Sequence, residues 1–153
     1  MVYKLDFYTS YNQFYIADKD TDADTGADNF WSDEAFVSRF ATGNGIIGLR
    51  TQCYGTVKGE LIVLEKANSE FDLSEFDHIV EGGLKVNSGV LQILDCPNSS
   101  LELEVKVDSG MYKVRIYSSN LRSVEDDEGD DYYKIEIWPD ADMAINVLKN
   151  YEE

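Results

Sequence analysis

Alternation of apolar and polar residues is the dominant pattern along this chain, and it indicates β-strands. In Leu101–Val107, four aliphatic side chains fall on one face, and two glutamates and a lysine fall on the other. Tyr112–Tyr117 alternates in the same way, and the Asp-Ser-Gly sequence before it is typical of a turn. The pattern therefore predicts a hairpin, with Lys113 and Arg115 opposite the outward glutamates.

The same alternation predicts seven further strands. They are expected at Tyr3–Tyr8, Tyr11–Ala17, Ile46–Cys53, Lys58–Leu64, His78–Val86, Val90–Leu94 and Tyr132–Trp138. Nine strands with short connections and few helices predict a mostly β protein, an antiparallel β-sandwich of jelly-roll type, with a closed barrel as the alternative. The length of 153 residues suits a single domain over residues 1–153.

Two short helices are expected within this β framework. Ser32 is suited to cap the first helix, because two acidic residues follow it in the first turn. Phe36 and Phe40 would share one face of that helix, and Gly43–Gly45 would end it. A second, shorter C-terminal helix is predicted at Asp142–Asn150.

Composition and charge narrow the classes of function. The chain is 43% hydrophobic, which is too apolar for a disordered protein. It has 30 acidic and 13 basic residues, and the net charge of -17 disfavours direct binding to nucleic acid or an anionic membrane. Without a signal-like N-terminus we expect a cytoplasmic protein in which Cys53 and Cys96 are reduced thiols, the alternative being that they pair.

Negative charge is concentrated in two stretches. Asp18–Glu34 holds seven acids and one lysine, and Glu125–Asp131 holds six acids and no base. The simplest interpretation is two solvated loops. The alternating aspartates of the first stretch also fit part of a calcium-binding loop, but Ala23 and Asn29 stand where that loop needs glycine and glutamate. No metal site is therefore predicted.

A further interpretation of the acidic stretches is that they bind a basic protein. Carboxylates can imitate the phosphates that a nucleic-acid enzyme binds, and neighbouring aromatic residues can anchor such a surface. The predicted partner-binding residues are Asp20, Asp22, Asp24, Trp31, Glu125, Asp126, Asp127, Asp130 and Tyr132. For each aromatic residue, ordinary core packing is the alternative.

The chain offers few catalytic groups. His78 is the only histidine, and its alternating segment places it on a strand surface rather than beside Cys53 or Cys96 as a base. Gly43–Gly48 fits G-x-G-x-x-G by letter, but it follows the predicted helix and opens a strand, the reverse of a dinucleotide site. We therefore predict no enzyme and no cofactor. A weak enzyme that uses paired carboxylates stays open as an alternative.

Two local motifs resemble a known family. Ser10-Tyr11-Asn12-Gln13-Phe14, followed by Trp31-Ser32-Asp33-Glu34-Ala35, is similar to the bacterial competence protein J family, also called DNA-entry nuclease inhibitor. The resemblance covers residues 8–52 and implies inhibition of a nuclease by protein contact, without chemistry of the chain's own. The Asp-rich insertion and the second acidic run depart from that family.

The leading hypothesis is therefore an acidic inhibitor or immunity-type protein whose basic partner is a nuclease or nuclease toxin. The alternative from another class is a β-sandwich that binds a small ligand or carbohydrate without catalysis. The ten tyrosines and two tryptophans of the chain permit an aromatic cleft of that kind.

Overall fold

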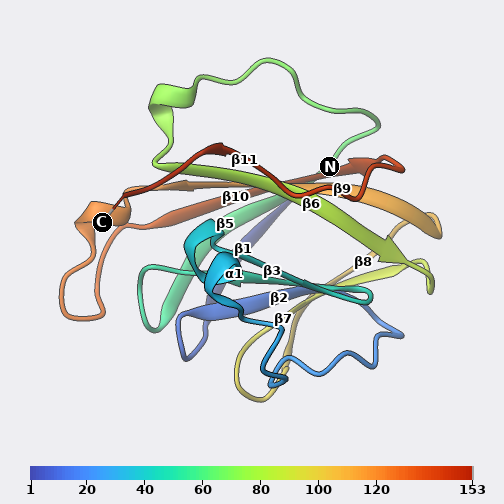
Figure 1. Cartoon of the computed structure of the whole chain (residues 1–153), viewed down its shortest axis with the longest axis horizontal. Helices are drawn as coiled ribbons and strands as arrows, with labels where there is room; N and C mark the ends of the chain where they lie inside the picture. Colours follow the sequence, from blue (N-terminus) through green and yellow to red (C-terminus); the bar gives the residue numbers. More distant parts are fainter. Residues whose placement is uncertain (153) are drawn as a thin grey trace.

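The computed structural model describes residues 1–152, and about half of them form strands in two sheets (Figure 1). Sheet A contains β1 (Val2–Tyr8), β5 (Thr56–Val63), β10 (Tyr132–Pro139), β9 (Gly110–Ser119), β6 (His78–Val86) and β11 (Asn146–Lys149), in that spatial order. Sheet B contains β3 (Phe40–Gly43), β4 (Ile46–Arg50), β2 (Gln13–Asp18), β7 (Val90–Leu94) and β8 (Leu101–Lys106). The helical parts are α1 (Asp33–Ser38) and the single turns η1 (Leu73–Glu75) and η2 (Leu121–Ser123).

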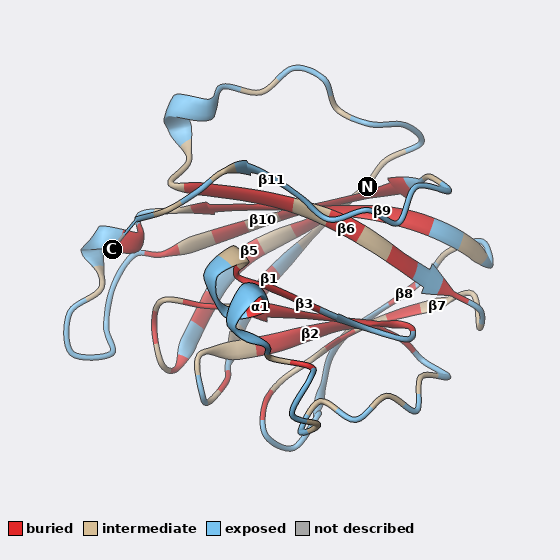
Figure 2. Cartoon of the chain, in the orientation of Figure 1, coloured by how far each residue is buried: buried red, intermediate tan, exposed pale blue. Residues whose placement is uncertain are grey.

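The main core lies between the two sheets (Figure 2). Alternate residues of each strand point inward, so that Val114 and Ile116 of sheet A and Phe14 and Ile93 of sheet B belong to one buried cluster. Each fully buried aliphatic or aromatic side chain contributes about 2 kcal/mol. Burial of these alternating residues therefore holds the two sheets together, and the predicted mostly β class is confirmed.

The Asp-rich segment between β2 and α1 covers the outer face of sheet B. Phe30 and Ala23 of this segment pack in a second apolar cluster with Tyr15, Ala17 and Ile46. This cover explains why β2 is buried on both faces, although an exposed sheet face would leave every second residue in water.

The predicted hairpin between Leu101–Val107 and Tyr112–Tyr117 is wrong. The first segment becomes β8 of sheet B and pairs with β7, whereas the second becomes β9 of sheet A and pairs with β6 and β10. Alternation reports that one face of a strand is buried, and this holds equally for strands side by side and for strands that face each other across a core. The predicted pairing of Lys113 and Arg115 with the glutamates of β8 fails for the same reason.

Lys113 and Arg115 instead belong to a buried polar layer on the outer face of sheet A. Arg115 Nε lies 2.9 Å from Glu81 Oε1, and Lys113 Nζ lies 3.2 Å from Asp142 Oδ2. Arg115 also donates to the backbone oxygen of Asn68, at 2.7 Å. The segments between β5 and β6 and between β10 and β11 cover this layer, which is why both basic residues are almost fully buried.

The first helix is shorter than predicted. Ser32 caps it as expected, since its Oγ accepts a hydrogen bond from Ala35 N at 3.1 Å. The helix ends at Ser38, because Arg39 takes the left-handed conformation, with a φ of 63°. Phe40 then starts β3 and is buried in the core, while Phe36 is exposed. The two rings therefore share no helix face, and the glycines of 43–45 form the turn between β3 and β4.

The predicted helix at Asp142–Asn150 is also wrong, because this segment forms β11 and pairs with β6. Gly83 in β6 makes the close approach possible. A Cβ at this position would lie 2.0 Å from Met143 Sδ and 2.6 Å from Met143 Cα. The missing side chain lets the backbone before β11 lie directly against the sheet.

One pair of strands departs from the expected antiparallel arrangement. β10 lies between β5 and β9, and it is parallel to β5 and antiparallel to β9. Sheet A is therefore mixed, and these pairings do not establish a jelly-roll topology. Within residues 1–152, no helix has the length and apolar character needed to cross a membrane.

Candidate interface at one end of the sheets

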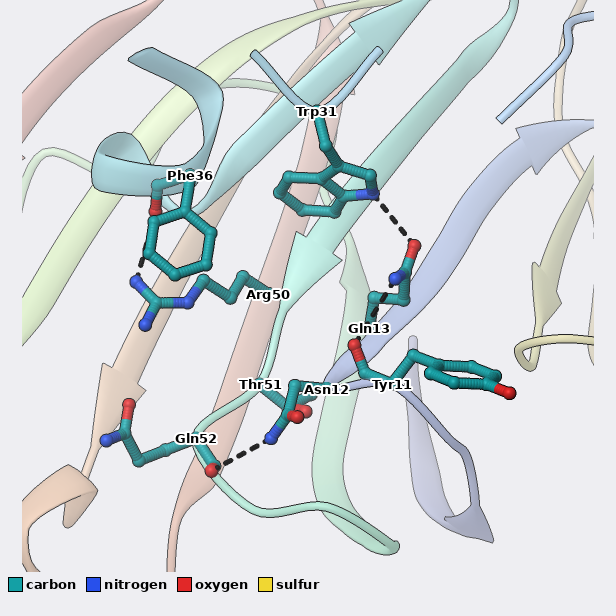
Figure 3. Close-up of a pocket in the computed structure, with 8 residues that line it drawn as sticks. All are labelled: Tyr11, Asn12, Gln13, Trp31, Phe36, Arg50, Thr51 and Gln52. Carbon is teal, nitrogen blue, oxygen red and sulfur yellow. Dashed lines mark hydrogen bonds between the residues drawn. The ribbon is translucent and has the colours of Figure 1, made fainter. Parts of the chain in front are cut away.

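A pocket lies where β2 begins and β4 ends. Gln13 of β2 pairs with Arg50 of β4 in an antiparallel ladder, so the residues before one strand and after the other meet. Thr51 N donates to Asn12 O at 2.8 Å, and Asn12 Nδ2 donates to the backbone oxygen of Gln52 at 3.1 Å. The pocket has a volume of about 420 Å³, and Figure 3 shows the residues that line it.

Trp31 forms one wall of the pocket. Its indole Nε1 donates a hydrogen bond to Gln13 Oε1 at 2.8 Å (Figure 3). The ring packs edge-on against Phe30, with centroids 5.8 Å apart. Gly48 of β4 leaves room for both rings, since a Cβ there would lie 2.8 Å from Trp31 and 2.9 Å from Phe30. Trp31 was predicted to be an anchor at a partner-binding surface, and it lies in a pocket wall.

Phe36 and Arg50 form the opposite wall. The guanidinium carbon of Arg50 lies 3.7 Å from the centre of the Phe36 ring, and its Nη1 donates to the Phe36 backbone oxygen at 3.1 Å. Stacking of this kind holds the Arg50 side chain against α1. Tyr11 contributes a third aromatic side chain, which is exposed and lies edge-on to Tyr54 at 6.1 Å.

The second acidic run forms a compact turn between η2 and β10. Glu125 and Glu128 exchange two backbone hydrogen bonds of 2.7 and 2.9 Å, and Asp126 and Asp127 between them have positive φ values of 48° and 67°. Asp130 N donates to Ser123 Oγ at 2.8 Å. All five acids from Glu125 to Asp130 are exposed, so this turn presents a dense negative charge to solvent.

Asp131, the last acid of this run, is buried and joins the acidic turn to the pocket. Its Oδ2 accepts from Cys53 N at 3.1 Å and from the Tyr133 hydroxyl at 2.6 Å. The Tyr133 hydroxyl in turn accepts from Gln52 N at 2.6 Å, and Cys53 Sγ donates to the backbone oxygen of Asp127 at 2.8 Å. Gln52 lines the pocket and Cys53 contacts the acidic turn, so these two consecutive residues connect the pocket with the turn.

This connection has electrostatic consequences. Burial raises the pKa of the Tyr133 hydroxyl well above its ordinary value, and the Asp131 carboxylate adds to the shift. Burial, followed by the negative charges of Asp131 and Asp127, also raises the pKa of the Cys53 thiol. Cys53 and Cys96 are both buried free thiols, and Cys96 Sγ lies 3.4 Å from the Tyr15 hydroxyl oxygen. Neither cysteine is set up as a nucleophile.

The aspartates of the first run lie at the other end of β4. Thr21 Oγ1 donates to Asn44 O at 2.7 Å, which fixes the segment to the turn between β3 and β4. β4 has five residues and therefore spans about 17 Å between this turn and the pocket. Figure 1 likewise shows the start of the Asp-rich segment, where it leaves β2, and the loop before β10 on opposite sides of the molecule. Asp20, Asp22 and Asp24 therefore do not form one continuous face with Glu125, Asp126, Asp127 and Asp130.

Within the first run, burial alternates. Asp20, Asp22 and Asp24 are exposed, while Thr21 and Ala23 between them are partly buried against the protein. The run is therefore an extended strap on sheet B, and its carboxylates face solvent because the intervening residues face the sheet.

Asp18, the first acid of the strap, has a structural role. Its carboxylate accepts from Asn87 N at 3.0 Å, from Ser88 N at 3.1 Å and from the Ser88 hydroxyl. Although burial opposes the shift, the hydrogen bonds from Ser88 and Asn87 lower the pKa of Asp18. This carboxylate is committed to the turn between β6 and β7. Among residues 1–152, no three His, Cys, Asp or Glu side chains are arranged to hold a metal.

Tyr132 and His78 also differ from expectation. Tyr132 is half-buried and donates to Glu60 Oε1 at 3.0 Å, so its side chain lies over β5, and it does not line the pocket. His78 is completely buried rather than on a strand surface, because the end of α1 and the C-terminal segment cover it. Its Nε2 lies 2.6 Å from Ser38 O, and its Nδ1 accepts from Tyr151 N at 3.0 Å. Both ring nitrogens are therefore occupied.

Four further residues line the pocket although they were not predicted as site residues: Tyr11, Phe36, Arg50 and Gln52. The sequence nevertheless pointed to Tyr11 and Trp31, because each lies in one of the two motifs that resemble the competence protein J family. The contribution of Phe36 and Arg50 depends on the pairing of β2 with β4 and on the early end of α1. Neither feature can be read from alternation.

The fold consists of a mixed sheet A and an antiparallel sheet B, with the strap on sheet B and the aromatic pocket at the strand ends. This arrangement can be compared with the folds of known proteins. No family model matches the chain, and no curated protein matches it in sequence.

Solved structures do share its fold. ComJ from Bacillus subtilis, described as an inhibitor of the DNA degrading activity of NucA, aligns with a TM-score of 0.69 and 19% identity, over 92% of this chain and 99% of ComJ. The protein described as crocagin biosynthetic gene J aligns with a TM-score of 0.61 and 17% identity, over 92% of this chain and 97% of that protein. The resemblance indicated by the two motifs is therefore confirmed at the level of the fold.

Proposed function

We propose that this chain is a non-catalytic binding protein that inhibits a nuclease by occupying its basic substrate-binding surface. The observation that carries the proposal is the fold shared with ComJ, an inhibitor of a DNA-degrading activity, over 92% of this chain. The net charge of -17 supports it, because a nuclease that binds a polyanion has a positive surface of complementary charge.

The acidic turn and the pocket beside it are the proposed contact surface. Glu125, Asp126, Asp127 and Asp130 would face the positive groove, and Trp31 would contact an inserted side chain of the partner. Cys53 N donates to the Asp131 carboxylate, and Gln52 N donates to the Tyr133 hydroxyl, which itself donates to Asp131; these hydrogen bonds hold the two parts together before binding. A surface that is already ordered loses less conformational entropy when a partner binds.

The histidine and the two cysteines are buried inside the protein, which supports a function without catalysis. His78, the only histidine in the sequence, is buried with both ring nitrogens hydrogen-bonded. Both thiols are buried. A histidine that acts as a general base must reach the proton it removes, and no substrate can approach this one.

The first experiment is capture of proteins from the source cell at low and high ionic strength, followed by a DNA-cleavage assay with each captured nuclease. Exposed charges are screened within about 10 Å at 0.1 M salt, so binding is expected to weaken steeply as salt is added. Stoichiometric addition of this protein should abolish cleavage by the captured nuclease. Full cleavage in the presence of a saturating amount would contradict the proposal.

The pocket favours a second candidate, which is binding of a carbohydrate or another small ligand. Its volume of about 420 Å³ lies within the usual range for ligand sites, and it combines three aromatic side chains with the amides of Asn12, Gln13 and Gln52. A shared fold does not fix a partner, as the differing descriptions of the two solved neighbours illustrate. Screening of a glycan array separates the candidates, because a ligand-binding module should retain oligosaccharides in the absence of any protein partner.

A further inference from the structure

A second concave surface lies between α1 and β11, apart from the acidic turn. It is a groove of about 660 Å³ with an apolar floor. Val37 of α1 leaves 61% of its surface exposed, and Val147 and Leu148 of β11 leave 43% and 39% exposed. Contiguous apolar groups left in water at one place on a surface are typical of interaction sites.

The groove lies beside β11, which is an edge strand of sheet A. Four consecutive residues, Val147 to Asn150, line it. The pairing of β11 with β6 shifts register between Val147 and Lys149, so the regular alternation of side chains is interrupted at Leu148 and neighbouring side chains line the same groove. In the described part of the chain β11 is the last strand of sheet A, and β6 is its neighbour on the other side. An extended segment in the groove can therefore continue the sheet.

The rim of the groove is acidic. Asp33 and Glu34, in the first turn of α1, are exposed and line it. Lys149 also lines it, but its Nζ donates to the Leu73 backbone oxygen at 2.9 Å and is directed toward that segment. A second copy of this chain would bring another net charge of -17, whereas a basic segment would gain from the rim.

We propose that the groove between α1 and β11 receives an extended segment of a positively charged protein. The backbone of that segment pairs with β11, its alternate apolar side chains cover Val37, Val147 and Leu148, and its basic residues lie beside Asp33 and Glu34. This contact is separate from the acidic turn and does not depend on nuclease inhibition.

The test uses twelve-residue peptides with valine or isoleucine at alternate positions and lysine at both ends. Binding to the full chain is followed through the backbone amide resonances of Val147 and Leu148 by NMR. Matched peptides carry N-methyl groups on alternate backbone nitrogens or glutamate in place of lysine. Because strand addition needs backbone donors and the rim is acidic, we expect each change to weaken binding about tenfold or more.

Two valine variants locate the contact on the protein. Val37→Asp puts a charge on the floor of the groove and should weaken peptide binding about tenfold. The matched control is Val2→Asp, because Val2 is 58% exposed on β1, at the opposite edge of sheet A, and should leave binding unchanged. Circular dichroism verifies that both variants fold.

Three outcomes overturn the proposal. Absence of amide shifts at millimolar peptide means that the groove does not accept extended basic segments. Equal binding of the N-methylated peptides excludes pairing with β11. A concentration-dependent dimer in sedimentation, lost in Val37→Asp, assigns the groove to a second copy of the chain. Each result is independent of the nuclease-inhibition assay.

Discussion

Trp31 and Gln13 are joined by a hydrogen bond of 2.8 Å from the indole Nε1 to Oε1. One of these residues lies in each of the two short motifs that resemble the competence protein J family, and the fold brings the motifs together in one pocket wall. Gln13 Oε1 also accepts from the Tyr15 hydroxyl at 2.7 Å. A single amide oxygen therefore positions two aromatic side chains.

Replacement of Gln13 by leucine should release the Trp31 ring. Gln13→Leu removes the acceptor of both hydrogen bonds, and leaving such donors without a partner costs about 1–3 kcal/mol of unfolding free energy. Urea unfolding measures the loss, and a red shift of tryptophan emission should accompany it. Gln13→Glu keeps an oxygen acceptor and is expected to retain the wild-type emission. Equal spectra for both variants would mean that the hydrogen bond does not hold the ring.

Neutralising the acidic turn should slow association with a nuclease, whereas neutralising the strap should not. The two triple variants are Asp126→Asn, Asp127→Asn, Asp130→Asn, and Asp20→Asn, Asp22→Asn, Asp24→Asn. Both remove three negative charges, so the net charge of the two proteins is equal. Asparagine accepts positive φ readily, so the first variant should fold normally. Stopped-flow association is expected to slow about tenfold or more in the first variant only.

The same pair of variants also tests the location of the interface. If both slow association equally, net charge and not the acidic turn attracts the partner. If only the strap variant slows it, the contact lies at the end of the molecule near the turn between β3 and β4.

The free energy of unfolding should decrease as the pH is lowered, because of His78. Burial, with a contribution from the Arg39 and Arg50 charges, lowers the pKa of His78 to about 4, from an ordinary value of 6.5. The unfolded chain therefore takes up a proton first as the pH falls. The contribution of the neutral, buried His78 ring to the free energy of unfolding is complete above about pH 6.5. It is lost progressively toward pH 4, by about 3 kcal/mol in total.

Urea unfolding at pH 7.5 and 5.5 measures the first part of this loss, which should be about 1 kcal/mol. His78→Gln removes the titrating group, and its stability should change less over that interval, whatever its starting value. An identical pH dependence in the variant would assign the effect to other groups.

Gly83→Ala should destabilise the protein by displacing the segment before β11. The added Cβ would meet Met143 Cα at 2.6 Å, which is backbone and cannot turn aside. Overpacking of this kind costs about 1–3 kcal/mol. Gly110→Ala is the matched control, because a Cβ there has no atom within 4 Å. Comparable unfolding midpoints for the two variants would show that the segment before β11 adjusts freely.

Alternation located most strands because half-buried strands must alternate. The bounds of His78–Val86 and Val90–Leu94 agree with β6 and β7. Pairing could not be predicted in the same way. The hairpin prediction assumed that neighbours in sequence are neighbours in a sheet, whereas the turn before Gly110 leads from one sheet to the other. The segment 142–150 has apolar residues at helical spacing, and its strand form depends on a long-range contact with Gly83.

The candidate site was predictable in part. The acidic residues of 125–130 are exposed, as a solvated run should be, but the sequence could not show that Asp131 turns inward to Cys53. It also could not show that β4 separates the two acidic runs, because distance between loops is set by strand order. Pocket residues such as Arg50 were missed since they gain their position from the pairing of β2 with β4.

The place of β10 has a consequence for biosynthesis. This strand lies in the interior of sheet A, between β5 and β9, yet residues 132–139 are translated after nearly all the other strands. A nascent chain that has reached residue 131 has β5 and β9 but nothing to join them, and each exposes an unpaired edge. Closure of the sheet must wait for the ribosome to deliver this segment, so aggregation during slow synthesis is the hazard that the topology creates.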